Sequence, residues 1–281
     1  GTHRWISGRA MSETGTLDVV LLMRRPRPGY FSVERVFDAL LPHYESGINV
    51  RVVHLPASGV RPIALLRNLW FTFRIKADLV HITGETYYCA LTVVRPRCLL
   101  TILDIVSLHR LHGLRRRGVR LLFYSLPIRR SDLVTAISSS VADELRSEFG
   151  DVGEKLKVVY CPIGPEFTAE ARSDRPDSEV LKLLLVGTAK HKNLERVIDA
   201  VTGLPVQLHV VGHLDEGQMD QLNRAGINFR NSVAVESAEL VRLYREADVL
   251  VFASTYEGFG LPIAEAQALR VPVITSSVCS M

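Results

Sequence analysis

Short hydrophobic runs alternate with stretches of helical periodicity along most of the chain. In the first half these runs are rich in Val, Ile and Leu, and the first of them is followed by a helical stretch at 31–44. Runs of this kind, separated by helices, are typical of parallel strands that are buried on both faces of a sheet. The pattern predicts a doubly wound α/β unit with strands at 17–23, 48–55, 77–83, 98–103, 131–137 and 155–160.

The segment 161–179 interrupts this rhythm with Pro, Gly and charged residues, as an interdomain linker does. The alternation then starts again and predicts a second Rossmann-like unit. Two such units predict a cleft between them, with ligands at the carboxyl ends of the strands. The predicted strands of the second half are 180–187, 205–212, 227–231, 247–254 and 271–277, and its predicted helices are 193–202, 215–225, 236–246 and the residues after Gly260.

The same pattern sets the domain boundaries. We predict a first domain at 17–165 and a second at 166–281, and we treat 1–16 as a vector leader or a disordered segment. A composition of 47% hydrophobic and 23% charged residues is typical of a globular protein with a sizeable core. No apolar run reaches the roughly 18 residues that cross a bilayer.

Charge and cysteine content indicate which partners and which redox compartment to expect. Residues 1–165 carry 23 Lys and Arg against 14 Asp and Glu, whereas residues 166–281 carry 11 against 16, within a net charge of +4. The basic half favours an anionic surface or substrate, although single arginines also solvate an outer face. No nucleic-acid partner is expected. The four cysteines have no metal-ligand spacing, which indicates reduced thiols in the cytoplasm.

The stretch STYEGFGLPIAEAQ, which follows a predicted strand, carries the strongest chemical signal. Gly258 and Gly260 allow the backbone to approach a ligand, and Pro262 suits the first turn of a helix whose N–H groups and dipole attract an anion. Glu257 and Glu265 flank this turn, and their carboxylates suit pairs of sugar hydroxyls. Taken alone, Glu265 equally suits an N-terminal capping role.

A second cluster, VGTAKHKNLERVIDAV, combines a strand end, a small turn, lysines and a helix. Lys190 and Lys192 stand where they would meet a diphosphate, since lysine is a point charge on a flexible stem. The alternative is that both are solvated loop lysines.

Together these segments resemble the family 4 retaining glycosyltransferases, which adopt the GT-B fold. EGFGLPIAE matches the family's E-x7-E signature, and LLLVGTAKHKNLERVIDAV resembles its strand–glycine–lysine–asparagine–helix segment. LVRLYREADVLVFASTYEGFGLPIAEAQALRVPVITSS resembles the stretch from the preceding helix onward, and ADLVHITG, SDLVTAISSSVADEL and LKVVYCPIGPEF follow the expected order in the first half. The resemblance covers residues 17–281 and implies two Rossmann-like domains that face a cleft.

The resemblance implies a role for each matching residue. Glu257 would hold hydroxyls of the donor sugar, Glu265 the ribose of the nucleotide, and Lys192 the donor diphosphate. His191 stands in or near the place of an arginine that contacts the diphosphate in many members. Further donor-binding positions implied by the resemblance are Gly187, Gly258, Phe259, Gly260 and Leu261.

The implied reaction moves a hexose from a nucleotide-sugar to a glycan or lipid-linked acceptor, with retention at the anomeric carbon, in cell-surface polysaccharide synthesis. Glu257, Lys192 and Asp104 are the catalytic candidates. The site must stabilise the charge of the leaving diphosphate, which would itself take the acceptor's proton. We expect neither a metal nor a cofactor, because the sequence has no Asp-x-Asp and because Lys192 and a helix end would supply the positive charge.

Two features depart from the family pattern. In TILDIVSLH, Leu103 stands where relatives often have the histidine of Thr-x-His-Asp, so only Asp104 remains; His109 and His112 are either substitutes or ordinary loop histidines. The further strand and closing helices of the family's second domain do not follow Met281. This predicts an incomplete second domain with an exposed apolar edge at its final strand.

The stretch 109–130 holds seven arginines interleaved with Leu, Val, Phe and Tyr. It is typical either of a surface that docks on anionic lipid at the inner face of a membrane, or of a half-buried helix with a basic outer side. The first interpretation favours a lipid-linked acceptor. For the whole chain, the alternatives are a catalytically silent nucleotide-sugar-binding relative or partner subunit, which Leu103 favours, and a sugar-nucleotide epimerase, which the E-x7-E stretch disfavours.

Overall fold

The computed structural model describes residues 16–26, 32–94, 96–167 and 180–281, so residues 1–15 of the predicted leader (1–16) and the linker residues 168–179 lie outside the described residues. The chain divides into two compact units, Gly1–Tyr160 and Cys161–Met281. This division falls slightly before the predicted boundary, because Ile163 already packs against the core of the second unit.

The described strands of the first unit form one parallel six-stranded sheet in the order β2-β1-β3-β4-β5-β6. Each run predicted from hydrophobicity becomes one strand, and β1 is almost wholly buried, as a parallel strand covered on both faces should be. The strands are β1 (Leu17–Met23), β2 (Ile48–His54), β3 (Leu79–Ile82), β4 (Arg97–Ile102), β5 (Leu133–Ala136) and β6 (Leu156–Val158).

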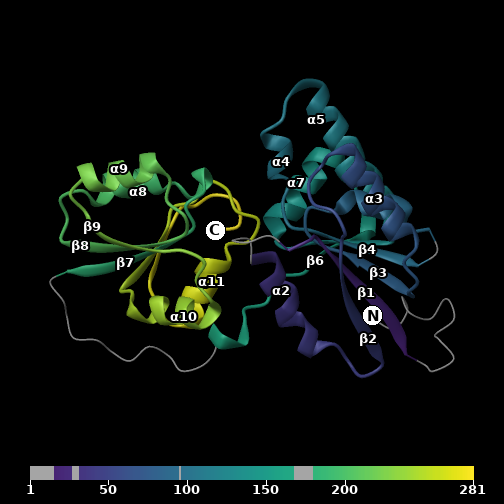
Figure 1. Ribbon diagram of the computed structural model, residues 1–281, viewed down its shortest axis with the longest axis horizontal. Coiled ribbons are helices and arrows are strands. Elements are labelled where there is room, and N and C mark those ends of the chain that lie inside the picture. The colour runs from purple at the N-terminus through teal and green to yellow at the C-terminus, as the bar shows by residue number, and fades with distance from the viewer. Residues whose placement is uncertain (1–15, 27–31, 95, 168–179) are drawn as a thin grey trace. The chain divides into compact units, whose positions relative to one another are not determined.

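Helices cover both faces of this sheet. Figure 1 shows α2 on one face and α3, α5 and α7 on the other, as right-handed crossovers require when the strand order reverses at β1. The helices are α2 (Ser32–Leu40), α3 (Pro62–Phe73), α4 (Val106–His109), α5 (Gly113–Val119), α6 (Leu126–Arg130) and α7 (Ser139–Phe149), with a π-helical segment, η3 (Arg120–Ser125), between α5 and α6. Short 3-10 helices are η1 (Leu41–His43), η2 (Tyr87–Thr92) and η4 (Gly153–Lys155).

The second unit repeats the architecture with a five-stranded parallel sheet of order β11-β10-β7-β8-β9. The strands are β7 (Leu181–Val186), β8 (Val206–Val211), β9 (Asn228–Ser232), β10 (Val249–Phe252) and β11 (Val273–Thr275). The helices are α8 (Leu194–Val201), α9 (Glu216–Arg224), α10 (Ser237–Glu246) and α11 (Leu261–Ala268), with the 3-10 helices η5 (Pro165–Phe167) and η6 (Lys190–Lys192).

Two hydrophobic cores hold the second unit together, one on each face of its sheet. Leu184, Leu250 and Phe252 belong to the core that includes residues of α10 and α11, whereas their neighbours Leu183 and Val251 belong to the core that includes residues of α8 and α9. Figure 1 shows these two pairs of helices on opposite faces of the sheet. This alternation is the period-two pattern of a strand buried on both faces. Strand β11 lies at the edge of the sheet, and its residue Ile274 is largely exposed.

The structure confirms the predicted α/β fold with two doubly wound units. All four cysteines are free thiols, in agreement with their spacing. Among the described residues, no helix combines the length and the apolar content that a membrane crossing demands.

A row of hydrogen-bonded polar side chains crosses three neighbouring strands in the interior of the first unit. The ring of His81 on β3 packs edge-on against the ring of Phe37. Its Nε2 atom is 2.7 Å from the hydroxyl of Thr101 on β4, and that hydroxyl is 2.7 Å from the hydroxyl of Thr135 on β5. Burial lowers the pKa of His81 to about 4, because the apolar surroundings disfavour the charged imidazolium. The ring is therefore neutral in the folded chain at neutral pH.

The buried, neutral His81 predicts that the stability of the fold depends on pH. Between pH 6.5 and about 4 the unfolded chain binds a proton at His81 that the folded chain does not. The free energy of unfolding should therefore fall as pH falls through this window, by at most about 1.4 kcal/mol per pH unit from this group. Urea unfolding of the parent and of His81→Gln at several pH values checks it, since the variant should lose this share of the slope. Identical slopes would contradict the prediction.

Candidate active site

The loop after β7 is shaped around Lys192. Gly187, the first residue after the strand, has φ of +98°, and a Cβ atom placed there would lie 2.8 Å from Cε of Lys192. The chain then forms η6 and turns through Asn193, whose left-handed φ of 62° starts α8. Glycine at 187 thus leaves the space along which the lysine stem runs.

The loop after β10 leads into α11. Gly260 has φ of +91° and is the N-cap of the helix, and Pro262 lies in the first turn, where its missing N–H costs no helical hydrogen bond. The two loops are joined by backbone and side-chain hydrogen bonds: the Thr255 N–H donates to the carbonyl of His191 at 2.8 Å, and the Asn193 amide donates to the carbonyl of Ala253 at 3.0 Å.

Lys192 and Glu257, 65 positions apart in the sequence, form an ion pair between these loops. The Lys192 Nζ atom is 2.6 Å from Oε1 of Glu257, and only 17% and 14% of the two side chains are exposed. The same ammonium lies 4.6 Å from the centre of the Phe252 ring, and Nε2 of His191 lies 4.0 Å from the same carboxylate oxygen. Partial removal from water strengthens such a pair relative to one on the open surface.

The two lysines of this loop differ in their surroundings. Lys190 is exposed, as a solvated loop lysine would be, whereas Lys192 is held inside the loop. The structure therefore brings together Gly187, His191, Lys192 and Glu257 of the predicted donor site.

Glu265 is held by a residue that sequence reasoning missed. It is the fifth residue of α11, is 8% exposed, and its Oε2 atom accepts a 2.8 Å hydrogen bond from the hydroxyl of Tyr244 on α10. Tyr244 is itself fully buried beside Phe167. Among the described hydrogen bonds at the start of α11, the N-cap residue Gly260 makes no side-chain cap.

The only signal for Tyr244 in the sequence was a tyrosine inside a predicted amphipathic helix. A buried tyrosine hydroxyl requires a partner, but nothing in the sequence says which one. The partner became visible only when the structure brought α10 and α11 to the same face of the sheet (Figure 1).

Asp104 lies in the first unit, just after β4. One carboxylate oxygen accepts a 3.0 Å hydrogen bond from the N–H of Val106. Burial raises the pKa of Asp104, and the negative charges of Glu85 and Glu144 raise it further, although the Val106 hydrogen bond lowers it. A carboxylate with a raised pKa is a better proton acceptor near neutral pH.

The residues around Asp104 differ in exposure. Leu103 is half-buried, and its N–H donates to the hydroxyl of Tyr87 at 3.1 Å. His109 is exposed, with Nε2 4.0 Å from Glu144, and His112 precedes α5 as its N-cap. The catalytic and binding roles of these residues, and of those in the second unit, stay predictions.

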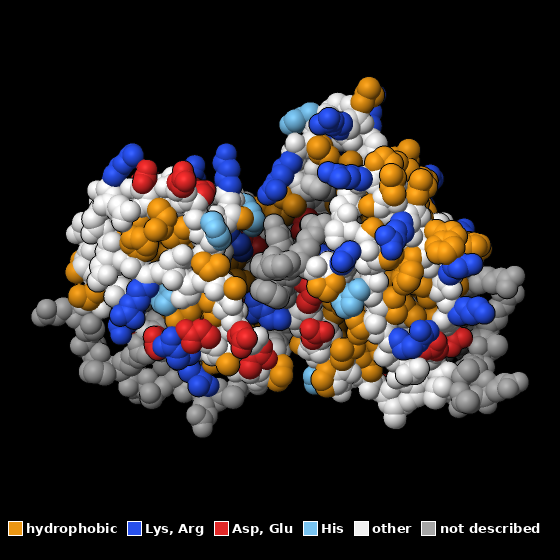
Figure 2. All heavy atoms as spheres, viewed as in Figure 1, with side chains coloured by type: hydrophobic (Ala, Val, Ile, Leu, Met, Phe, Trp, Pro, Cys, Tyr) orange, Lys and Arg blue, Asp and Glu red, His pale blue; other side chains and the backbone are white. Residues whose placement is uncertain are grey.

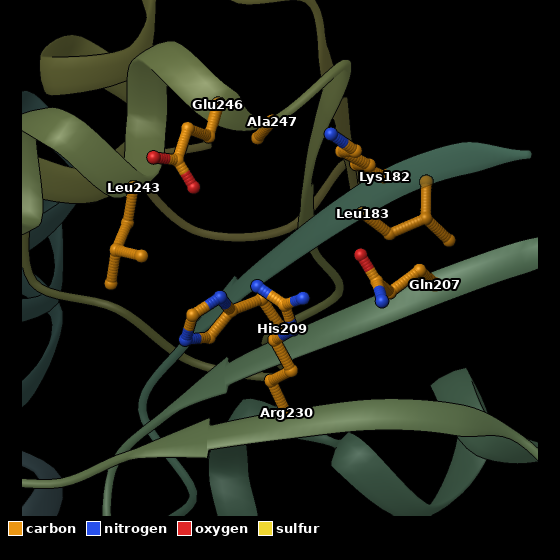
Figure 3. Close-up of a pocket in the computed structure, with 8 residues that line it drawn as sticks. All are labelled: Lys182, Leu183, Gln207, His209, Arg230, Leu243, Glu246 and Ala247. Atoms are coloured by element: carbon orange, nitrogen blue, oxygen red, sulfur yellow. The ribbon is translucent and has the colours of Figure 1, made fainter. Parts of the chain in front are cut away.

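A cavity elsewhere in the second unit contains none of the predicted residues. Figure 3 shows His209 and Arg230 projecting from β8 and β9 toward Glu246 at the end of α10. Burial lowers the pKa of His209, Arg230 adds to this effect, and the Nε2 atom is 2.8 Å from the hydroxyl of Ser232. The lining residues are Lys182, Leu183, Gln207, His209, Arg230, Leu243, Glu246 and Ala247.

This cavity reaches the first residues of β7, whereas ligands of open α/β sheets bind beyond the carboxyl ends of the strands. We therefore place the candidate active site at the loops after β7 and β10. Among the described residues, no group of three or more His, Cys, Asp and Glu side chains is arranged to hold a metal ion.

Comparison with known sequence families gives two matches that together span most of the chain. Residues 9–167 match the family described as Glycosyltransferase Family 4, and residues 180–281 match the one described as Glycosyl transferases group 1. The first match alone covers more than half of the chain.

Individual relatives are more distant. An uncharacterized glycosyltransferase of Methanocaldococcus jannaschii is 30% identical over 164 residues, which are 52% of this chain and 42% of that protein. The O-antigen chain mannosyltransferase RfbU of Salmonella typhimurium is 27% identical over 160 residues, which are 54% of this chain and 44% of that protein. The matched part thus spans less than half the length of these relatives.

Among solved structures, HepE of Anabaena in complex with UDP-glucose is similar in fold. The TM-score is 0.66 at 17% identity, and the similarity covers 94% of this chain and 81% of that one. At this identity the likeness speaks for the fold alone.

The packing of Gly187 against Lys192 predicts a specific coupling. Gly187→Ala and Gly203→Ala both place a side chain at positive φ, which costs about 1–2 kcal/mol, but only at Gly187 does the new Cβ meet another side chain. Gly187→Ala should therefore displace Lys192, break its ion pair, and cost about 1 kcal/mol more than Gly203→Ala in urea unfolding.

A double-mutant cycle checks the cause. In a Glu257→Gln background the extra cost of Gly187→Ala should largely disappear, because the ion pair is already absent. An unchanged difference between the two glycine variants would show that Gly187 and the ion pair are independent.

Proposed function

Because the chain belongs to glycosyltransferase family 4, we propose that it transfers a hexose from a nucleotide-sugar donor to a glycan or lipid-linked acceptor, with retention at the anomeric carbon. The observation that carries this proposal is the Lys192–Glu257 pair, held between the loops after β7 and β10. The UDP-glucose bound to HepE supports a nucleotide-sugar donor, and the name of RfbU supports a role in cell-surface polysaccharide synthesis.

On donor binding, the diphosphate oxygens replace Glu257 as the partner of the Lys192 ammonium. Glu257 is then available to accept hydrogen bonds from hydroxyls of the donor sugar, and the N–H groups of the turn before α11 and of its first residue, from Gly258 to Leu261, would bind the phosphates. We expect this exchange of partners to cost little free energy. The Lys192 ammonium passes from a carboxylate to phosphate oxygens, and the Glu257 carboxylate passes from an ammonium to sugar hydroxyls. His191, beside the same carboxylate, adds positive charge when protonated.

In the transfer step, the bond from the anomeric carbon to the phosphate oxygen breaks, and the acceptor oxygen bonds to the same face of that carbon. The acceptor's proton passes to the departing phosphate. Negative charge grows on the diphosphate as the bond breaks, so Lys192 and the start of α11 stabilise the transition state more than the bound donor. This positive charge takes the place of a metal ion, and activity should survive a chelator.

Tyr244 is a positioning residue in this proposal. By donating to one oxygen of Glu265, it directs the other oxygen toward the paired hydroxyls of the ribose. On the acceptor side, Asp104 at the carboxyl end of β4 orients the attacking hydroxyl, and its raised pKa suits that task.

The basic stretch 109–130 supports peripheral contact with the anionic inner face of a membrane. Two of its arginines, Arg116 and Arg120, are bound to Glu148 at 2.6 and 2.8 Å and are committed to the fold. Leu114, Leu121 and Leu122 are exposed on the same stretch. We place the protein in the cytoplasm, in keeping with its free thiols.

One observation favours a second function. Leu103 stands in the place of the family's histidine and cannot transfer a proton. A catalytically silent relative that only binds nucleotide-sugar would not need a proton-transferring group there. A thermal-shift screen with UDP-, GDP- and ADP-sugars finds the donor in either case, because a ligand of the folded state raises its stability. Donor hydrolysis, or transfer to a lipid extract, occurs only with the enzyme.

Lys192→Ala should lower the turnover of the donor found in that screen by about 10²–10³-fold, the scale for one charge-stabilising group. Lys190→Ala is the matched control, since this exposed lysine lies two positions away, and its turnover should change by no more than about twofold. Near-normal turnover in Lys192→Ala would remove this residue from the mechanism.

Tyr244→Phe should raise the KM for the donor about 3–10-fold through the loss of one hydrogen bond, and should leave kcat nearly unchanged. The reason is that the ribose is bound equally in the ground and transition states. In a Glu265→Gln background the same substitution should add little, because its target is already altered. A fall in kcat with constant KM would contradict the positioning role.

A further inference from the structure

Helix α3 buries its polar residues and exposes its large apolar ones. Asn68 and Thr72 are 1% and 2% exposed, whereas Ile63, Leu66, Trp70 and Phe73 are between 58% and 81% exposed. The four exposed residues follow at intervals of three or four and so form one stripe along the helix, which we call the α3 stripe. A surface helix of a globular protein has the opposite distribution.

Hydrogen bonds fix this orientation. The Asn68 side chain accepts from the N–H of Ala57 and donates to the carbonyl of the same residue, both at 3.0 Å, and it donates to the hydroxyl of Tyr88 at 2.8 Å. The Thr72 hydroxyl donates to the carbonyl of Asn68 at 2.8 Å. Turning the stripe inward would break the bonds of Asn68, and leaving those groups unpaired costs more than the apolar burial of one side chain returns.

The stripe continues into the basic stretch of the same unit. The ring of Tyr88, on η2, lies 5.1 Å from that of Phe123 on η3, and η2 packs against both α3 and η3. The exposed residues Leu121 and Leu122 belong to η3 as well. Figure 2 shows hydrophobic side chains gathered over this part of the first unit, with Lys and Arg side chains between them.

The segment of the chain that contains α3 carries charges of one sign. Residues 46–77 contain no Asp or Glu, while Arg61, Arg67 and Arg74 are exposed on and beside α3. The Arg74 guanidinium lies 4.1 Å from the centre of the Trp70 ring, so its stem runs along the apolar surface and its charge lies at the rim. Apolar residues surrounded by arginines suit a partner surface that has an apolar interior and negative charges at its boundary with water.

Helix α3 holds 12 residues and is therefore about 18 Å long, well short of the roughly 30 Å of a bilayer core. It cannot cross a membrane and would lie in the plane of the headgroups. A second copy of the chain is a poorer occupant, because a two-fold contact would set the arginines of one copy against those of the other with no acidic residue from 46–77 between them.

We infer that the α3 stripe inserts into the headgroup region of an anionic lipid bilayer. The inference rests on the membrane contact proposed above and assigns the apolar insertion to α3, with the arginines of 109–130 as its electrostatic flank. The cavity beside the helix, whose lining includes Asn68, Tyr88, Arg25 and Glu85, then lies close to the lipid headgroups.

Trp70 reports on the insertion directly. The chain has two tryptophans, so a Trp5→Phe background makes Trp70 the sole emitter. Vesicles of equal parts phosphatidylcholine and phosphatidylglycerol should shift its emission to shorter wavelength, and brominated acyl chains should quench it. Leu66→Gln should weaken vesicle binding about tenfold, and Arg67→Gln about fivefold.

Leu204→Gln is the matched control, since Leu204 is 56% exposed in the second unit, and it should bind vesicles like the parent. Unchanged melting temperatures of all three variants confirm that the fold is intact. Equal binding by Leu66→Gln and the parent would overturn the inference, as would equal binding to vesicles of phosphatidylcholine alone.

The alternative occupant gives a different result. If a second copy covers the stripe, the emission of Trp70 shifts with protein concentration in the absence of lipid, and sedimentation shows a dimer that Leu66→Gln dissociates; this outcome overturns the inference. Failure of the proposed transfer reaction is separate, because donor hydrolysis, which needs no lipid acceptor, is measured without vesicles. A chain that docks but turns over no donor refutes only the proposed activity, and one that turns over donor but ignores vesicles refutes only the docking.

Discussion

Parallel strands joined by right-handed crossovers place the loop after every strand at the same edge of the sheet. In the second unit the order β11-β10-β7-β8-β9 adds a further constraint. The chain leaves β7 toward α8 on one face of the sheet and leaves the adjacent β10 toward α11 on the other face (Figure 1). The two neighbouring loops thus lead to opposite faces of the sheet, and the Lys192–Glu257 pair connects them.

Most of the fold could be predicted from the sequence, because runs of Val, Ile and Leu mark buried strands by their length and by the turns that bound them. Each predicted run became a strand with bounds that differ by a few residues. The order of the strands within each sheet could not be predicted in this way. No local pattern states that β10 pairs with β7, so the meeting of Lys192 and Glu257 required the sheet order. The family resemblance named both residues for the donor and was silent about their contact with each other.

Helix α3 shows a second limit of sequence patterns. Its residues are apolar on nearly every side, so no amphipathic period identifies an inner face, and the stretch 62–73 did not stand out from the chain around it. The inner face is set instead by Asn68, whose partners Ala57 and Tyr88 come from a loop and from η2. Tyr244 and Glu265 repeat the lesson in the second unit: a buried polar side chain reveals its role only through a partner from another element.

The two units also differ in how they use charge. The first half of the chain carries an excess of basic residues and the second an excess of acidic ones. An anionic surface attracts the former and repels the latter within a Debye length of about 8–10 Å. The proposed donor is an anion as well, and the second unit, with its net negative charge, would bind it only if positive charge is concentrated at one point. Lys192 would meet that need, because Gly187 gives its stem room and its ammonium is paired with Glu257, so that a local arrangement of three residues would outweigh the charge of the whole unit.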